Sequence, residues 1–331
     1  MLWASNRIMA EEAVALGLRV THVADVADGQ GLLLMEGEGG SPRFHASGSM
    51  VSVQSAIGRE IARDKALTKA VLARAGLPVA PGVVLRCEDD LQRLVELEPP
   101  WVLKPLDGTH GQDVVIGVAT MEEAAAIFAE RRRPLLCEAV LHGREYRVVC
   151  VGFQVVAAAL RKPAFVVGDG RRSVAELVDE KNREPHRRPG HHGDRTRIDV
   201  DAEVLAELAR QHLDPGSIVP AGEEVLLRRR ANLSQGGEAY DATDEVCPEN
   251  RALFARVAEA VDLAVVGIDV MADSLGEPLA GQPAAGIIDV NARPGLRMHH
   301  APSGGQPRNV ARAILKMTLG RLCPREQAGT R

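Results

Sequence analysis

The stretch Trp101-Val-Leu-Lys-Pro-Leu-Asp-Gly-Thr-His-Gly-Gln112 joins a short apolar segment to a glycine-rich loop. Residues 101–104 have the composition of a strand, and residues 114–118 that of a strand returning beside it. Lys104 ends the first strand, where it is well placed to meet a phosphate, because loop amides cradle anions and the lysine adds positive charge. By itself, a glycine-rich hairpin is also compatible with an ordinary turn.

Apolar periodicity and turn signals around this hairpin predict a mixture of helices and strands. Residues 1–60 have the pattern of a small α/β unit. Further elements are expected as helices over residues 64–75, 121–131, 202–212, 248–263 and 307–319, and as strands over residues 135–140, 146–151, 154–160, 224–227, 264–271 and 285–290. Thr120 with Glu123, and Ser173 with Glu176, have the spacing of capping boxes. Residues 183–196, rich in arginine, histidine, proline and glycine, are expected to form a mobile surface loop.

Composition and charge exclude several classes of protein. The 331 residues are 45% apolar and 26% charged, as in ordinary globular proteins. The net charge of −5 does not favour nucleic acid or an anionic membrane as a partner, and no segment has the pattern of a signal peptide or membrane span. The five scattered cysteines fit neither a disulfide framework nor a structural zinc site. We therefore expect a reduced, cytoplasmic protein.

Two apolar segments near the C-terminus carry acidic and amide side chains. Asp269 lies in Val265-Val-Gly-Ile-Asp-Val270, and Asp289 and Asn291 lie in Ile287-Ile-Asp-Val-Asn291. Alternation along a strand places positions 289 and 291 on one face. Carboxylate and amide oxygens are the ligands that Mg²⁺ takes alongside phosphates. The alternative is that they are strand-end acids and a turn asparagine, although a carboxylate among apolar neighbours needs a partner.

A third segment, Cys137-Glu-Ala-Val-Leu-His-Gly-Arg-Glu145, leads from an apolar strand into a short link. Such a link can offer backbone groups to an adenine edge, and a carboxylate such as Glu138 or Glu145 to ribose hydroxyls. Solvated glutamates would have the same pattern.

A fourth segment, Arg228-Arg-Arg-Ala-Asn-Leu-Ser-Gln-Gly-Gly237, follows an arginine run with small residues. This composition suits a strap that closes over phosphate and developing negative charge. A solvated basic stretch is the alternative, and the adjoining Asn232, Ser234 and paired glycines favour the strap. Lys65, at the start of a predicted helix, has by itself the pattern of a solvated first-turn residue.

In this order and spacing, the segments resemble the ATP-grasp superfamily, above all the ATP-grasp domain of cyanophycin synthetases and then that of bifunctional glutathione synthetases. The likeness runs from about residue 52 to residue 316. It is carried by Ser55-Ala-Ile-Gly-Arg-Glu-Ile-Ala-Arg-Asp-Lys-Ala-Leu-Thr-Lys69, Lys104-Pro-Leu-Asp-Gly-Thr-His-Gly111, Gly168-Asp-Gly170, Leu227-Arg-Arg-Arg-Ala-Asn-Leu-Ser-Gln-Gly-Gly237, Ala242-Thr-Asp-Glu245, Pro294-Gly-Leu-Arg-Met-His299 and Arg308-Asn-Val310.

The resemblance implies an α+β protein with the ATP-grasp fold, in which two α/β subdomains clamp ATP. We expect a short N-terminal α/β subdomain over residues 1–51, the ATP-grasp domain over residues 52–320 and a tail over residues 321–331. It also implies an ATP- and Mg²⁺-dependent carboxylate–amine ligase that forms an amide or peptide bond through an acyl-phosphate, with two Mg²⁺ ions. Its partners would be a small-molecule carboxylate and amine, such as an amino acid or small peptide, and a homo-oligomer is left open.

Two alternatives to this activity also remain open. One is ligation of a specialised-metabolite acid, and the other is an ATP-binding subunit without turnover.

The site residues that the resemblance implies fall into four groups. ATP would be held by Lys65, Lys104, Thr109, His110, Gly111, Glu138, Val140, Leu141 and Glu145. The metal ligands would be Asp269, Asp289 and Asn291. The reacting groups would be stabilised by Arg147 with Arg228 or Arg229. The substrates would lie near Glu60, Asn232, Ser234, Arg297 and Ser303.

The sequence also departs from the family pattern. Asp289 stands where the family more often has glutamate, and Arg230 where threonine is usual. The long N-terminal domain of cyanophycin synthetases is reduced here to about fifty residues, and their C-terminal Mur-ligase-like domain is not seen. We therefore expect that the chain adds a single residue and does not build a polymer alone.

Overall fold

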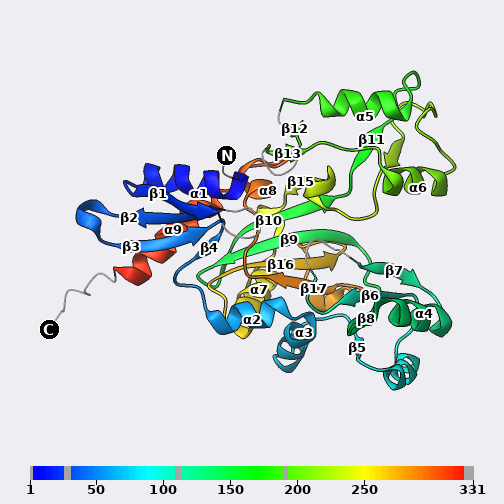
Figure 1. Ribbon diagram of the computed structural model, residues 1–331, viewed down its shortest axis with the longest axis horizontal. Coiled ribbons are helices and arrows are strands. Elements are labelled where there is room, and N and C mark those ends of the chain that lie inside the picture. The colour runs from blue at the N-terminus through cyan, green and yellow to red at the C-terminus, as the bar shows by residue number, and fades with distance from the viewer. Residues whose placement is uncertain (1–2, 26–30, 109–112, 186, 190–192, 324–331) are drawn as a thin grey trace. The chain divides into compact units, whose positions relative to one another are not determined.

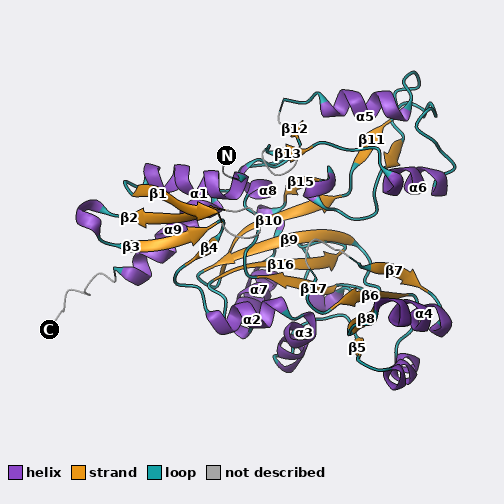
Figure 2. Cartoon of the chain, viewed as in Figure 1, coloured by secondary structure: helices purple, strands orange, loops and turns teal. Residues whose placement is uncertain are grey.

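The computed structural model describes residues 3–25, 31–108, 113–185, 187–189 and 193–323. Figures 1 and 2 show its helices and strands. The chain divides into two compact units, each built from segments that are far apart in the sequence. Unit 1 comprises Met1–Ser52, Ala159–Ala242 and Gly295–Arg331, and unit 2 comprises Val53–Ala158 and Thr243–Pro294. The division at residues 51 and 320 that the sequence suggested stays a prediction.

One sheet of unit 2 is antiparallel in the order β5-β8-β6-β7. Its strands are β5 (Gly82–Leu85), β8 (Leu135–Ala139), β6 (Trp101–Pro105) and β7 (Val115–Val118). α4 (Met121–Arg131) begins where the Thr120 hydroxyl accepts a hydrogen bond from the Glu123 amide, and its apolar side packs into the same core. Cys137 of β8 is fully buried there, and burial raises the pKa of its thiol to about 12.

A second group of strands in unit 2 carries most of the acidic candidates. β9 (Arg144–Val151), β16 (Val265–Ala272) and β17 (Gly286–Asn291) are antiparallel neighbours. β9 turns into β10 (Gln154–Lys162) at Gly152 and Phe153, which have φ values of 59° and 64°. These values suit a tight hairpin turn, as the sequence predicted. β10 continues into unit 1, where it pairs with β15 (Glu238–Asp241).

Three helices of unit 2 pack on these strands. They are α2 (Ala56–Arg63), α3 (Lys65–Arg74) and α7 (Pro248–Ala260). The carboxylate of Asp64 accepts hydrogen bonds from the amides of Ala66 and Leu67 and caps α3. α2 and α3 contact β17, and α7 contacts β9 and β16. The capping of α3 therefore fixes its first residue, Lys65, beside β17.

The N-terminal part of unit 1 is a four-stranded antiparallel sheet in the order β1-β2-β3-β4. Its strands are β1 (Arg19–Asp25), β2 (Gly31–Glu36), β3 (Arg43–Ser47) and β4 (Met50–Val51). α1 (Ala4–Ala15) packs against this sheet and against α9 (Val310–Leu322). Within the described residues, no helix has the length and apolar character needed to cross a bilayer.

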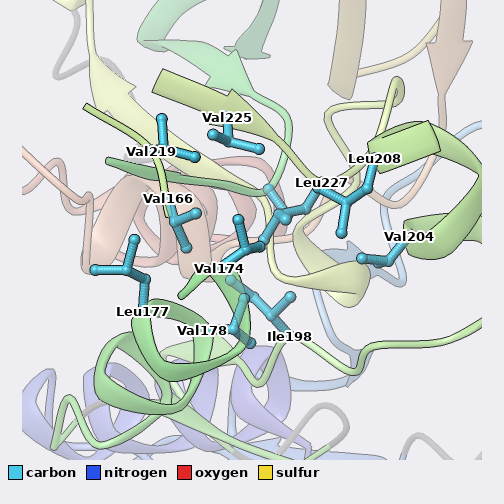
Figure 3. Close-up of a cluster of buried hydrophobic side chains, with 11 residues drawn as sticks. Val166, Val174, Leu177, Val178, Ile198, Val204, Leu208, Val219, Val225 and Leu227 are labelled. Carbon is cyan, nitrogen blue, oxygen red and sulfur yellow. The ribbon is translucent and has the colours of Figure 1, made fainter. Parts of the chain in front are cut away.

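Residues 164–227 of unit 1 enclose an apolar cluster of their own, shown in Figure 3. It is built by β11 (Phe165–Val167) paired with β14 (Glu224–Leu226), by α5 (Val174–Asn182) and by α6 (Ala202–Arg210). Ser173 and Glu176 form the predicted capping box at the start of α5. The side chains labelled in Figure 3 come from both strands, both helices and the connecting residues.

Three local predictions are wrong. The last helix begins at Val310 rather than at residue 307, because Asn309 provides its cap by accepting from the Arg312 amide. The Glu123 carboxylate accepts from the amide of Ala119 rather than from that of Thr120. The described part of residues 183–196 contains the paired strands β12 (Arg187–Arg188) and β13 (Arg195–Thr196).

Arg187 explains the last difference. Its side chain is buried and donates to the carbonyls of Thr196 and Gly236 and to the carboxylate of Glu238, at 2.9, 3.2 and 2.6 Å. This guanidinium ties the segment to β15. α8 (Arg297–His300) completes the elements of unit 1 and contacts β15.

Candidate functional site

Two lysines of unit 2 converge on β17. Lys65 Nζ donates to the carbonyl of Gly108 at 2.8 Å and lies 3.6 Å from Oδ2 of Asp289. Lys104, at the end of β6, donates to the carbonyl of Ile288 at 3.2 Å. Lysines from a helix start and a strand end thus meet next to an acidic residue, although they are far apart in the sequence.

A third lysine, Lys69, belongs to the same group, and the sequence assigned it no role. Glu138 on β8 accepts from Lys69 through one carboxylate oxygen, at 2.5 Å, and from Lys104 through the other. Burial lowers the pKa of Lys69, although the charge of Glu138 opposes this effect. Lys65, Lys69, Glu138 and Asp289 line one small pocket together with Leu136 and other apolar side chains. In the sequence, Lys69 has the pattern of an ordinary solvated lysine on a helix. Its contact with Glu138 in the structure distinguishes it from such a residue.

The predicted metal ligands lie together on neighbouring strands of unit 2. Asp269 on β16 is the register partner of Asp289 on β17 and of Arg147 on β9. Arg147 binds both carboxylate oxygens of Asp269, with Nη2 2.8 Å from Oδ2. Asn291 Nδ2 lies 3.4 Å from the same oxygen. The alternation that placed positions 289 and 291 on one face therefore brings both side chains near Asp269.

The charge at Asp289 bears on whether a divalent cation fits here. Burial raises the pKa of Asp289; the charges of Lys65 and Lys104 lower it, and that of Asp269 raises it further. The positive charges of Lys65 and Lys104 therefore do not fully offset the cost of burying the negative charge of Asp289. A bound divalent cation would supply further positive charge. Two carboxylates and an amide are suitable hard oxygen donors for Mg²⁺, so the residues fit this ion. Among the described residues, no group of three or more His, Cys, Asp or Glu side chains could hold a metal ion.

The remaining candidates of unit 2 are spread around this group. Val140 and Leu141 follow β8 and are half-buried, and the Val140 amide donates to the carbonyl of Pro100 at 3.3 Å. Glu145 is half-buried on β9. Glu60 is exposed on α2 and pairs with Arg63 at 2.8 Å. The candidates Thr109, His110 and Gly111 lie outside the described residues.

The candidates of unit 1 form a second group, which is described by itself. Arg228 is buried and paired with Asp201 at 2.8 Å and with Glu203 at 2.7 Å. Arg229 is exposed and lies 3.3 Å from Glu207. These ion pairs attach the arginine run to α6, so the run is not simply a solvated basic stretch.

The other candidates of unit 1 lie near residues 232–239. Asn232 precedes a short 3₁₀ turn that contains Ser234. Arg297 is buried and donates to the carbonyls of Gly193 and Leu233, at 2.9 and 3.3 Å, and to the Thr196 hydroxyl at 3.2 Å. The Ser303 amide donates to the carbonyl of Ala239 at 2.6 Å. Arg297 therefore organises loops of this unit.

Comparison with known proteins relates this arrangement to one superfamily. A profile described as the RimK-like ATP-grasp domain matches residues 62–171. Over 286 residues, the chain is 42% identical to the cyanophycin synthetase of Nostoc sp. strain PCC 7120, an alignment that covers 85% of this chain and 31% of that protein. The crystal structure of a bifunctional glutathione synthetase from Pasteurella multocida matches with a TM-score of 0.74 at 28% identity, over 97% of this chain and 44% of that one. The chain belongs to the ATP-grasp superfamily.

A further relative, the glutathione biosynthesis bifunctional protein GshAB of Pasteurella multocida, is 32% identical over 285 residues, which cover 83% of this ATP-grasp chain and 38% of that protein. The ATP-grasp fold and the likeness to both groups of synthetases, predicted from the sequence, are confirmed. The chain spans less than half the length of these relatives. ATP-grasp ligases in general use ATP together with Mg²⁺.

Proposed function

We propose that this ATP-grasp chain is an ATP- and Mg²⁺-dependent ligase that joins a carboxylate to an amine. The observation that carries the proposal is the convergence, within unit 2, of Lys65 and Lys104 with Asp289 on β17. A nucleotide triphosphate needs cations for its phosphates and acidic ligands for its metal ion. Both kinds of group occur side by side here. The likeness to two groups of synthetases supports the same activity.

Each side chain has a role that follows from its chemistry. Bound ATP and Mg²⁺ would supply an activated phosphoryl group, which the substrate carboxylate takes up as ADP leaves. Lys65 and Lys104 would hold the phosphates and offset their charge. Asp269, Asp289 and Asn291 would hold Mg²⁺, and we propose two ions.

Arg147 lies beside the proposed metal ligands and is fixed by Asp269. A guanidinium held in this way can stabilise the developing charge of the acyl-phosphate without reorganising. The substrate amine then attacks the acyl carbon and phosphate leaves, which forms the amide bond. The proton that the amine loses in this step passes to water. We propose an amino acid or small peptide as substrate, because the chain is similar to proteins named as cyanophycin synthetase and as a glutathione biosynthesis protein.

The test is a panel of amino acids and dipeptides, each offered as acid and as amine with ATP and MgCl₂. ADP release is measured by a coupled assay, and the product is identified by mass spectrometry. We expect ADP release that depends on one acid–amine pair and yields the mass of the two substrates minus one water. Binding of ATP without ADP release across the panel would contradict the proposal and favour an ATP-binding subunit without turnover.

A further inference from the structure

Lys69 has no part in the reaction proposed above, although its side chain points into the same group of charges. It lies on α3 one helical turn after Lys65, and its side chain is 16% exposed. Its Nζ lies 2.5 Å from Oε1 of Glu138 and also donates to the carbonyl of Ala80. The ammonium group is thus directed at a carboxylate and a carbonyl of its own chain.

The backbone leaves space for this ion pair at Gly82 of β5. A Cβ built on Gly82 would lie 2.9 Å from Cγ of Glu138 and 3.2 Å from Nζ of Lys69. It would also lie 2.8 Å from the backbone carbonyl of Cys137, which cannot move easily within the sheet. The absence of a side chain at position 82 therefore permits Lys69 and Glu138 to meet.

Glu138 is shared between two cations. One oxygen faces Lys69 and the other faces Lys104, and the side chains of Glu138 and Lys104 are each 6% exposed. A carboxylate buried to this degree is strongly destabilising when it loses its cationic partner. If Lys104 turned towards a phosphate, Glu138 would need a second cation, and Lys69 is in contact with it.

We propose that Lys69 is a positioning residue for nucleotide binding. Lys69 keeps Glu138 neutralised, and this releases Lys104 to bind phosphate. The proposal rests on the proposed function, because it requires that the chain binds ATP through Lys104. Lys69 acts through Glu138 and does not itself touch the nucleotide.

The test is a double-mutant cycle in which binding of the ATP analogue AMP-PNP with MgCl₂ is measured by titration calorimetry. Lys69→Met is expected to weaken binding about tenfold, because Glu138 then holds Lys104. In a Glu138→Gln background, the same change is expected to alter binding by less than about twofold, because no carboxylate remains to be neutralised. Lys69→Arg keeps the cation and is expected to bind within about threefold of the wild type.

Two controls separate this role from others. Arg74→Met removes a positive charge from an exposed position of the same helix and is expected to leave AMP-PNP binding unchanged. In turnover assays, Lys69→Met is expected to raise KM for ATP about tenfold and to leave kcat within about threefold. If Lys69→Met does not fold, Lys69→Gln enters the same cycle with the same expectation, since its amide can still donate to Ala80.

The outcomes that would overturn the inference are distinct. Equal losses of affinity in the two backgrounds would mean that Lys69 contacts the nucleotide directly. Unchanged affinity of Lys69→Met would mean that Glu138 does not compete for Lys104. Either result would leave the proposed function standing. A wild-type chain that binds no AMP-PNP would overturn the proposed function and this inference together.

Discussion

Arg147 and Asp269 lie directly opposite each other on β9 and β16, and the guanidinium of one binds both carboxylate oxygens of the other. Both side chains are buried. Asp269 is therefore both the structural partner of Arg147 and a proposed metal ligand, so its replacement should affect stability as well as metal binding.

Replacing Asp269 by asparagine is expected to lower both stability and metal affinity. Arg147 would remain buried without its carboxylate, which costs about 3 kcal/mol of the free energy of unfolding. Urea unfolding in EDTA measures this loss, and the MgCl₂ dependence of ADP release measures the second effect. Asp273→Asn, at an exposed position just after β16, is the matched control and is expected to change neither quantity.

Replacing Asp289 by asparagine is expected to separate the two effects. Burial raises the pKa of this carboxyl above 3.8, so ionisation of Asp289 progressively destabilises the folded state as the pH rises above 3.8. At pH 7 and in EDTA, the variant is therefore expected to melt at the same temperature as the wild type or higher. The rise in melting temperature on adding MgCl₂ and ADP should be smaller than in the wild type. A variant that keeps the full rise would place the metal ion elsewhere.

Lys104→Ala is expected to reduce kcat/KM for ATP by about 100-fold or more, because a cation for the phosphates is lost from a buried position. The fold should persist, since Glu138 keeps Lys69 as its partner at 2.5 Å. Lys316→Ala, at an exposed position of α9, controls for the loss of a lysine. Steady-state kinetics together with circular dichroism measure both expectations, and full activity in a folded variant would refute the role of Lys104.

Glu238 is expected to make the stability of unit 1 depend on pH. Burial by itself raises the pKa of Glu238, but hydrogen bonds from Tyr240 and Lys181 and the charges of Lys181 and Arg187 outweigh it and lower the pKa below 4.5. The stabilisation is therefore fully present above pH 4.5 and is lost as the pH falls through the lowered pKa. Glu238→Gln should lose about 3 kcal/mol at pH 7.

As the pH falls below 4.5, the difference in melting temperature between the wild type and Glu238→Gln should shrink, and melting temperatures from pH 3 to pH 7 test this. Glu224→Gln, which removes a half-exposed carboxylate paired with Lys162, is the control and should cost less than about 1 kcal/mol. A constant difference between Glu238→Gln and the wild type across this range would contradict the assignment.

Elements with strong local signals were predictable from the sequence. The hairpin at Gly152 and Phe153 and the capping of α5 by Ser173 depend on adjacent residues. β15 was missed because Glu238–Asp241 is short and polar, and only its pairing with β10 makes it a strand. The start of α9 was misplaced because Pro307 suits a first helical turn, whereas the Asn309 cap determines where the turn begins.

The candidate site was predictable where residues share a strand or a motif. Alternation along one strand placed Asp289 and Asn291 on one face, and Asp269 was an acidic residue in another apolar segment. The register of β16 and β17 brings the two segments together. Lys69 was not predictable, because it lies on helix α3 and its partner Glu138 lies on β8, far along the chain. The hydrogen bonds from Arg297 to backbone carbonyls were not predictable either, because those carbonyls belong to loops that are distant in the sequence. Their catalytic roles stay predictions.

Because the thiol of Cys137 is buried, its alkylation can be used to detect local opening of the β5-β8-β6-β7 sheet. Its raised pKa keeps it protonated, and its neighbour Glu138 bears the carboxylate shared by the two lysines. Alkylating reagents at neutral pH react with thiolates in solvent, so the exposed Cys87 and Cys323 are labelled first. Cys137 is labelled only when β8 leaves its neighbours. The rate of Cys137 alkylation therefore measures local unfolding of the strand that carries Glu138. No probe has to be introduced into the chain.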